Sequence, residues 1–211
     1  MFGSARYTNP EAGDHAVSTD PLEQSAAEAA VRASWREFPY YPKRYGERGW
    51  RFSLSDTGWI QTLCHLSVHD ARGQVAWLGR MLATRGMPTY MLERHLVLLH
   101  QELLRVARDR ESKYAALLDC AAFLRETRNA QTPEAHFDEL AQRFEARVRG
   151  RVAHVANMGV IVVAAAADER AGITGTIASV DSWVCDPARF DAEWIAAVRD
   201  TSAAALDAQS W

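Results

Sequence analysis

The chain has 211 residues, a formal net charge of −3 and 48% hydrophobic residues. This composition is typical of a globular protein that buries a sizeable core without disulfides. The near balance of charge excludes a general attraction to nucleic acid or to an anionic membrane surface. Only Lys43 and Lys113 are lysines, so arginine supplies most of the positive charge. Together with abundant alanine, this bias indicates GC-rich coding, as in many bacteria.

Segment 1–19 lacks the apolar stretch of a signal peptide, so we expect a flexible tail followed by a single helical domain over residues 20–211. The longest apolar run, 152–167, is interrupted by His154 and Asn157 and is shorter than the ~20 residues that cross a bilayer. Three widely spaced cysteines in apolar surroundings predict reduced thiols and a cytoplasmic location without membrane contact. They are Cys64, Cys120 and Cys185.

Helix-start signals divide the first half of the chain. In "DPLE", Asp20 is a predicted N-cap, with proline at the first helical position and Glu23 at the capping-box position. That helix is expected to end near Phe38, before Pro39. "SLSD" (53–56) and "SVHD" (67–70) are two further capping boxes, each predicted to open a helix.

The helical pattern continues to the end of the chain. Gly86 ends one predicted helix and Pro88 begins the next, which bends near "RDRES" (108–112) and then resumes. A long helix is predicted from Thr132, with an apolar stretch from Phe137 to Val163. Within it, "GVIVVAAAA" is interpreted as helix rather than strand because no second strand is available for pairing.

"DPARFDAEW" opens a last helix that carries Phe190, Trp194 and Val198. The predicted fold class is therefore all-α, a single domain of six to eight helices.

Neither histidine pair supports a metal site. The spacing of His65 and His69 suits two ligands on one helix, but the predicted capping box between them places them on different helices. His95 and His100 are five residues apart and point about 140° from one another on a helix. A hydrogen-bonded core histidine is the favoured interpretation of either. Glu-x-x-His, HExxH, GxSxG, GxGxxG and Walker-type patterns are absent from the sequence, so no catalytic residue is assigned.

The stretch "FPYYPKRYGERGWRF" (38–52) combines six aromatic rings with four basic side chains. Its prolines and glycines predict an irregular loop. Packing of the rings against the helices is the favoured interpretation. In the alternative, arginines hold an acidic ligand while rings stack on it; the residues concerned are Arg44, Arg48, Arg51, Tyr41, Tyr45 and Trp50. Glu37, Glu47 and Asp56 argue against nucleic acid as the ligand.

"LGRMLATRGMPTYML" (78–92) resembles the haem-ligand region of bacterial globin-type sensor domains, in which a G-x-x-H-x-x-x-G-[LM]-P pattern places the proximal histidine. Gly79, Gly86, Met87 and Pro88 fit the pattern, but Leu82 stands at the histidine position. The resemblance covers about fifteen residues and implies a globin-like fold without the iron ligand. The same stretch is also similar to the helical cap of cobalamin-binding photoreceptors and methyltransferases. A tight corner between two helices would use the same glycine and proline.

The favoured function is a regulatory or sensor domain that binds a small apolar or acidic ligand or a protein partner, with a pocket lined by Trp77, Leu82, His95 and Leu99. The Phe137–Val163 helix is predicted to pair in a homodimer or with a regulatory protein. One alternative is a helical-bundle protein that binds haem, another tetrapyrrole or a corrin through His95 or His100. The other is a structural interaction module without a ligand.

Overall fold

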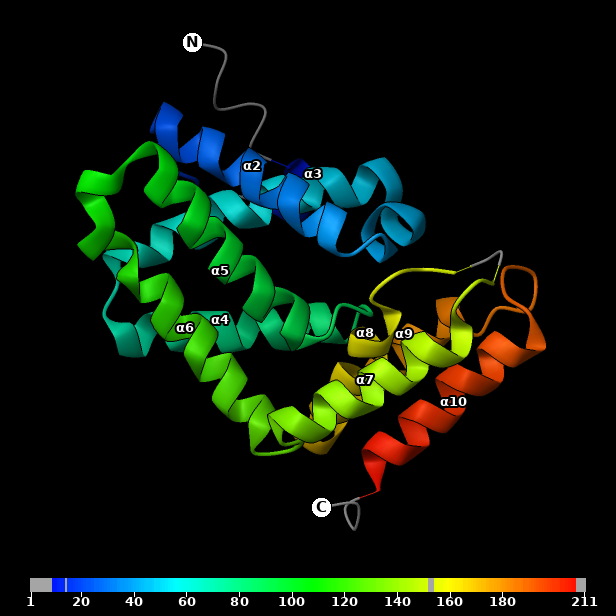
Figure 1. Cartoon of the computed structure of the whole chain (residues 1–211). Helices are drawn as coiled ribbons and strands as arrows, with labels where there is room; N and C mark the ends of the chain where they lie inside the picture. The colour runs from blue at the N-terminus through cyan, green and yellow to red at the C-terminus, as the bar shows by residue number, and fades with distance from the viewer. Residues whose placement is uncertain (1–8, 14, 152–153, 208–211) are drawn as a thin grey trace. The chain divides into compact units, whose positions relative to one another are not determined.

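A computed structural model describes residues 9–13, 15–151 and 154–207 (Figure 1). Every regular element in these residues is a helix, which confirms the all-α prediction. Nine are α-helices, close to the predicted six to eight. Their bounds are α2 Pro21–Glu37, α3 Tyr40–Thr62, α4 Val68–Ala83, α5 Thr89–Val106, α6 Glu111–Asn129, α7 Glu134–Val148, α8 Met158–Arg170, α9 Thr176–Val184 and α10 Ala192–Leu206. Short 3-10 turns are η1 Pro10–Ala12, η2 Leu63–His65 and η3 Arg108–Arg110.

The chain divides into two compact units. Unit 1 comprises residues 1–76 and 93–123, and unit 2 comprises residues 77–92 and 124–211. Unit 1 therefore contains α2 and α3, whereas unit 2 contains α7 to α10; α4, α5 and α6 contribute residues to both units. The single domain expected over residues 20–211 stays a prediction. No helix among the described residues combines the length and apolar character needed to cross a membrane.

Helix α2 begins at the predicted cap. The Asp20 carboxylate accepts the backbone N–H of Leu22 at 2.8 Å, and Pro21 takes the first helical position. Glu23 does not complete a capping box. Its buried carboxylate instead accepts the Ser18 hydroxyl, the Lys113 ammonium group at 2.6 Å and the Tyr114 hydroxyl at 2.9 Å. Glu23 thus joins α2 to α6 within unit 1.

The aromatic stretch is helical, and the prediction of an irregular loop is wrong. Helix α3 begins at Tyr40 and contains the whole stretch from there on. Pro42 lies in the first turn, where a helix does not need the missing N–H. Gly46 has a φ of 53° and absorbs a kink that other residues would resist. Burial of the Phe38, Tyr40 and Tyr41 side chains stabilises this arrangement.

The capping box predicted at "SLSD" is also wrong, because Ser53–Asp56 lie inside α3. Ser53 accepts the indole N–H of Trp35 at 3.3 Å, and its carbonyl accepts the Thr57 hydroxyl. Leu54 packs with Val31 of α2 in a small apolar cluster that Trp35 and Trp50 flank. These contacts make α3 the packing partner of α2.

The next boundaries confirm the sequence signals. The Ser67 hydroxyl oxygen accepts the N–H of Asp70 at the start of α4, and the same hydroxyl donates to the Asp70 carboxylate. The chain turns after Ala83 at Gly86, which has a φ of 86°, and α5 begins at Thr89 directly after Pro88. The predicted bend near "RDRES" is the turn η3, after which α6 begins.

The prediction of one long helix over residues 137–163, in unit 2, is wrong. Helix α7 ends at Val148, and α8 begins only at Met158. Gly150 has a φ of 81° and Asn157 has a φ of 61°, left-handed conformations that interrupt a helix. Val152, which was expected on the same apolar face, lies outside the described residues. The "GVIVVAAAA" run is helical, as predicted.

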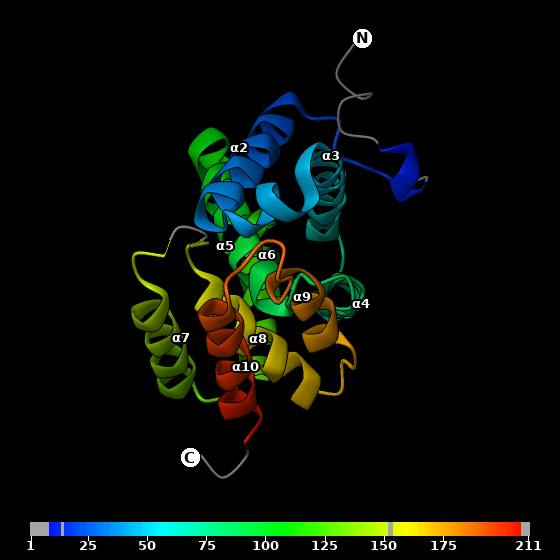
Figure 2. The same cartoon turned by 90° about the vertical axis from the view of Figure 1, so that its right-hand side faces the viewer.

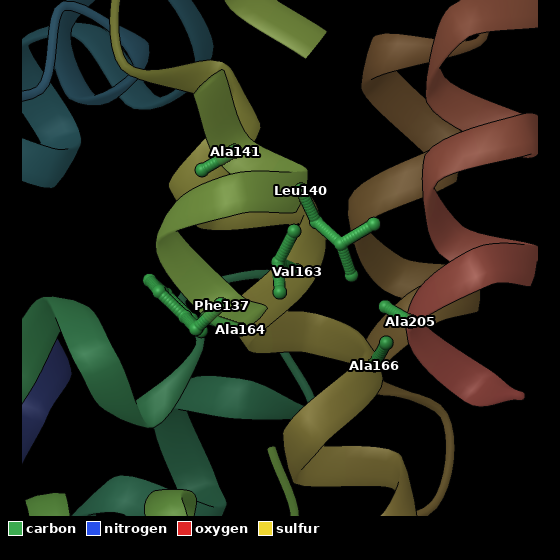
Figure 3. Close-up of a cluster of buried hydrophobic side chains, with 7 residues drawn as sticks. All are labelled: Phe137, Leu140, Ala141, Val163, Ala164, Ala166 and Ala205. Atoms are coloured by element: carbon green, nitrogen blue, oxygen red, sulfur yellow. The ribbon is translucent and has the colours of Figure 1, made fainter. Parts of the chain in front are cut away.

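Buried side chains of α7, α8 and α10 form the core of unit 2, in which the three helices pack against one another (Figures 2 and 3). The apolar face of α7 is therefore covered within the chain, and its pairing with a second copy or a partner stays a prediction. The cluster comprises Phe137, Leu140, Ala141, Val163, Ala164, Ala166 and Ala205. Helix α9, which the sequence analysis did not separate, packs on α8. Asp191 caps α10 by accepting the N–H of Trp194, so Phe190 precedes that helix.

Part of the expected N-terminal tail packs on α3 within unit 1. The turn η1, with Asn9 and Gly13 as its caps, contacts that helix. The His15 ring lies 3.0 Å from the Ser55 hydroxyl, and the Ser18 N–H donates to the Gly58 carbonyl. Residues 1–8 and 14 lie outside the described residues.

Candidate functional site

Two arginines on one face of α3 hold a carboxylate. Arg48 and Arg51 are three residues apart, a spacing that puts both side chains on the same side of a helix. Arg48 Nε donates to Glu11 Oε2 at 2.8 Å, and Arg51 Nη2 donates to Oε1 of the same carboxylate at 3.4 Å. The hydrogen bond from Arg48 is the main cause of a lowered pKa of Glu11. The pair of guanidinium groups thus already binds a carboxylate in this structure.

Aromatic rings support the guanidinium groups. Arg48 lies over the Phe52 ring, 5.3 Å from its centroid, and Arg32 of α2 lies over Trp50 at the same distance. Trp50 meets Trp35 edge to face at 5.1 Å. Rings below an arginine orient its planar fork and attract its charge. We refer to Arg48, Arg51 and Phe52 of α3 as the arginine–aromatic surface.

The charge of this region differs from that of the whole protein. Residues 32–56 contain six basic and three acidic residues and carry a net charge of +3, whereas the chain as a whole carries −3. Glu37, at the end of α2, is engaged by Arg94, which donates to both carboxylate oxygens at 2.7 and 3.2 Å. Arg32 is paired with Glu28, whereas Arg48 and Arg51 meet only the exposed Glu11 among the ion pairs described. The side chains of Arg48 and Arg51 are at least half exposed, as is that of Arg32.

The remaining predicted residues of the aromatic stretch belong to a separate cluster. The Arg44 guanidinium lies over the rings of Tyr40 and Tyr45 and donates to the Tyr40 hydroxyl. Tyr41 is buried and stacks on Trp35. Burial raises the pKa of Tyr41 and of Tyr45, so both phenols stay neutral. The structure thus brings Arg48 and Arg51 together on Glu11, whereas Trp50 packs against Arg32 and Trp35. Tyr41, Arg44 and Tyr45 make packing contacts.

His95 lies in a buried polar network of unit 1. Its Nδ1 is 2.7 Å from the Ser34 hydroxyl, and its Nε2 is 2.9 Å from the Thr57 hydroxyl. Thr57 donates its single proton to the Ser53 carbonyl, so Nε2–H must donate to Thr57 and Nδ1 must accept from Ser34. Burial lowers the pKa of His95 to about 4. Both nitrogens are occupied, so an axial bond to a tetrapyrrole or corrin would require one hydrogen bond to break.

The predicted pocket residues do not form one cluster within either unit. His95, Leu99 and His100 belong to unit 1, whereas Trp77 and Leu82 belong to unit 2. Leu99 is fully buried, and Trp77 is 55% exposed. Burial lowers the pKa of His100, and the negative charge of Glu111 offsets part of this shift. The predicted break between His65 and His69 is confirmed, because His65 ends η2 and His69 lies in α4. The described residues contain no group of three side chains suited to a metal ion.

The cysteines are not candidate nucleophiles. Burial raises the pKa of Cys64 to about 12 and the pKa values of Cys120 and Cys185 to about 11. Each therefore remains a thiol at neutral pH, and the thiolate is the reactive form. All three cysteines are free, as expected from their spacing.

The roles of three carboxylates were not predicted from the sequence. They are the buried Glu23 and Asp168, and Glu11, which Arg48 and Arg51 bind. Glu23 was interpreted as a capping residue, and Asp168, which accepts the N–H and hydroxyl of Thr89 in unit 2, was not singled out. Burial raises the pKa of Asp168 to about 6. Glu11 lies 37 residues before Arg48, and no spacing rule connects the two.

Comparisons with known protein families, with characterised proteins and with solved structures found no match. The likeness of residues 78–92 to globin-type sensor domains, and to cobalamin-binding caps, stays a prediction.

Proposed function

We propose that the chain is a regulatory binding domain that recognises an acidic segment of a partner protein through the arginine–aromatic surface. The observation that carries this proposal is the carboxylate of Glu11 between Arg48 and Arg51. Arginine forks match carboxylate oxygens in geometry as well as in charge. Neither Arg48 nor Arg51 is needed for the core, because their side chains are 69% and 50% exposed.

An acidic polypeptide fits the surface better than nucleic acid does. The bound group in the structure is a carboxylate of a protein chain. Nucleic-acid surfaces carry a long stripe of basic residues, whereas Glu37, Glu47 and Asp56 interrupt the basic residues of segment 32–56. The half-buried Phe52 ring adds apolar contact beside the charge of Arg48, a combination that is frequent in protein interfaces.

Fluorescence anisotropy with a fluorescein-labelled polyglutamate peptide tests the proposal on the full chain. Replacing Arg48 and Arg51 together by alanine is expected to weaken binding about ten-fold at low salt, because two charge-assisted contacts are lost. The matched control replaces Arg143 and Arg147 of α7, which are also exposed and ion-paired. The control is expected to bind as the unchanged protein does.

Two results would contradict the proposal. An equal loss of peptide binding in the two double-arginine variants would mean that the protein attracts any polyanion without specificity. Tight binding of single-stranded RNA without binding of the peptide would identify a nucleic-acid surface instead. Circular dichroism of each variant establishes that the helices are retained.

A further inference from the structure

The turn that presents Glu11 is ordered by its own contacts. Asn9 is buried and caps η1, with its side-chain oxygen accepting the N–H of Glu11 at 3.2 Å. The Asn9 carbonyl accepts the N–H of Ala12 at 2.8 Å and closes the turn. Glu11 is therefore held at the apex of a short turn rather than on an extended chain.

The segment after the turn is fixed to α3 farther along that helix. His15 lies against Ser55, and Ser18 donates its N–H to the Gly58 carbonyl. Val17 packs on Gly58, where an added Cβ atom would lie 3.1 Å from a Val17 methyl carbon. Because residues 15–18 are attached to the helix that carries Arg48 and Arg51, the turn stays close to both arginines at high effective concentration.

The contact between Glu11 and the arginines is nonetheless suited to exchange. The Glu11 side chain is 45% exposed, and both guanidinium groups are at least half exposed. Ion pairs in such surroundings are weak, and salt screens them. A partner with several carboxylates can replace one of them without disturbing the core.

We propose that the Asn9–Gly13 turn is an intramolecular competitor, in which Glu11 occupies the position that a partner's carboxylate takes between Arg48 and Arg51. This inference rests on the proposed function of the same surface. The partner binds only molecules in which Glu11 has left the two arginines. The apparent affinity for the partner is therefore the intrinsic affinity multiplied by the fraction of such molecules. The N-terminal segment would thus set the threshold at which an acidic partner binds.

The test measures the affinity of the full chain for the labelled polyglutamate peptide in three variants. Glu11→Gln is expected to bind about two- to five-fold more tightly, because a weak surface pair no longer competes. Asn9→Ala leaves the net charge unchanged but removes the cap of the turn, and it is expected to change the affinity in the same direction. Glu47→Gln is the matched control: it removes one exposed negative charge from α3 without removing the competing group.

The outcomes separate this inference from the proposed function. Unchanged affinity in Glu11→Gln and Asn9→Ala, together with a loss in the Arg48 and Arg51 double variant, overturns the competitor and leaves the binding surface standing. An equal gain in Glu11→Gln and Glu47→Gln also overturns it, since general charge then explains the effect. Full binding by the double arginine variant overturns the proposed function itself.

Discussion

His95 shows how one neutral imidazole joins three helices of unit 1. It lies on α5 and hydrogen bonds to Ser34 of α2 and Thr57 of α3. Burial lowers its pKa from an ordinary 6.5 to about 4, so the folded state favours the neutral ring. The unfolded chain takes up a proton at a higher pH than the folded chain does. The stability that the neutral ring supports is therefore complete above about pH 6.5 and is lost as the pH falls toward about 4.

We expect the contribution of His95 to the free energy of unfolding to fall by about 2 kcal/mol between about pH 7.5 and pH 5. His95→Gln should lower stability at neutral pH, because the network loses its fitted ring, and should remove most of this pH-dependent loss. Urea denaturation followed by circular dichroism at both pH values measures the effect. His69→Gln, which changes an exposed histidine of α4, is the control. A variant at His95 that keeps the full pH dependence would refute the buried neutral ring.

The sequence predicted the environment of His95 but not its partners. A histidine on the apolar face of a helix was interpreted as a hydrogen-bonded core residue, and the structure confirms this. Ser34 and Thr57 are 61 and 38 residues away. Helical periodicity identifies the buried face of each helix, but it does not determine which faces meet or in what register.

At the scale of the element, α3 shows how burial outweighs helix-breaking residues. Two prolines and two glycines predicted an irregular stretch, yet Pro42 occupies a tolerated position and Gly46 takes up the kink. The α7–α8 break shows the opposite error. Apolar periodicity predicted one helix across residues 137–163, while Gly150 and Asn157 interrupt it. The predicted caps were reliable where the side chain accepts a backbone N–H of the first helical turn, as at Asp20 and Ser67.

The close contact between α7 and α8 depends on Gly159, which has no side chain. A Cβ atom at Gly159 would lie 2.5 Å from the Ala141 carbonyl oxygen, which is a backbone atom and cannot rotate away. Gly159→Ala is therefore expected to lower the free energy of unfolding by about 3 kcal/mol, at the upper end of overpacking costs. Urea denaturation at neutral pH measures the change.

Gly73→Ala is the matched control, since a Cβ atom at this position of α4 meets nothing within 4 Å. It is expected to stabilise the protein by about 0.5–1 kcal/mol, because alanine favours helix more than glycine does. Equal effects of the two substitutions would contradict the close approach of α7 and α8.

For the whole molecule, the distribution of charge matters more than its sum. A net charge of −3 excluded a general polyanion-binding protein, yet segment 32–56 carries +3. The sequence identified Arg48, Arg51 and Trp50 as candidates for an acidic ligand, and the structure brings the two arginines together on one carboxylate. It could not identify Glu11 as their carboxylate, because that contact depends on how residues 9–18 fold against α3.

The most direct measurement of the central proposal is an NMR titration of the 15N-labelled full chain with the polyglutamate peptide, recording arginine Nε–H and tryptophan indole signals. We expect the Nε–H signals of Arg48 and Arg51 to shift first and to saturate together, because these two groups hold one carboxylate. Unmoved signals of both arginines at saturating peptide, or shifts confined to unit 2, would contradict a carboxylate-binding surface on α3.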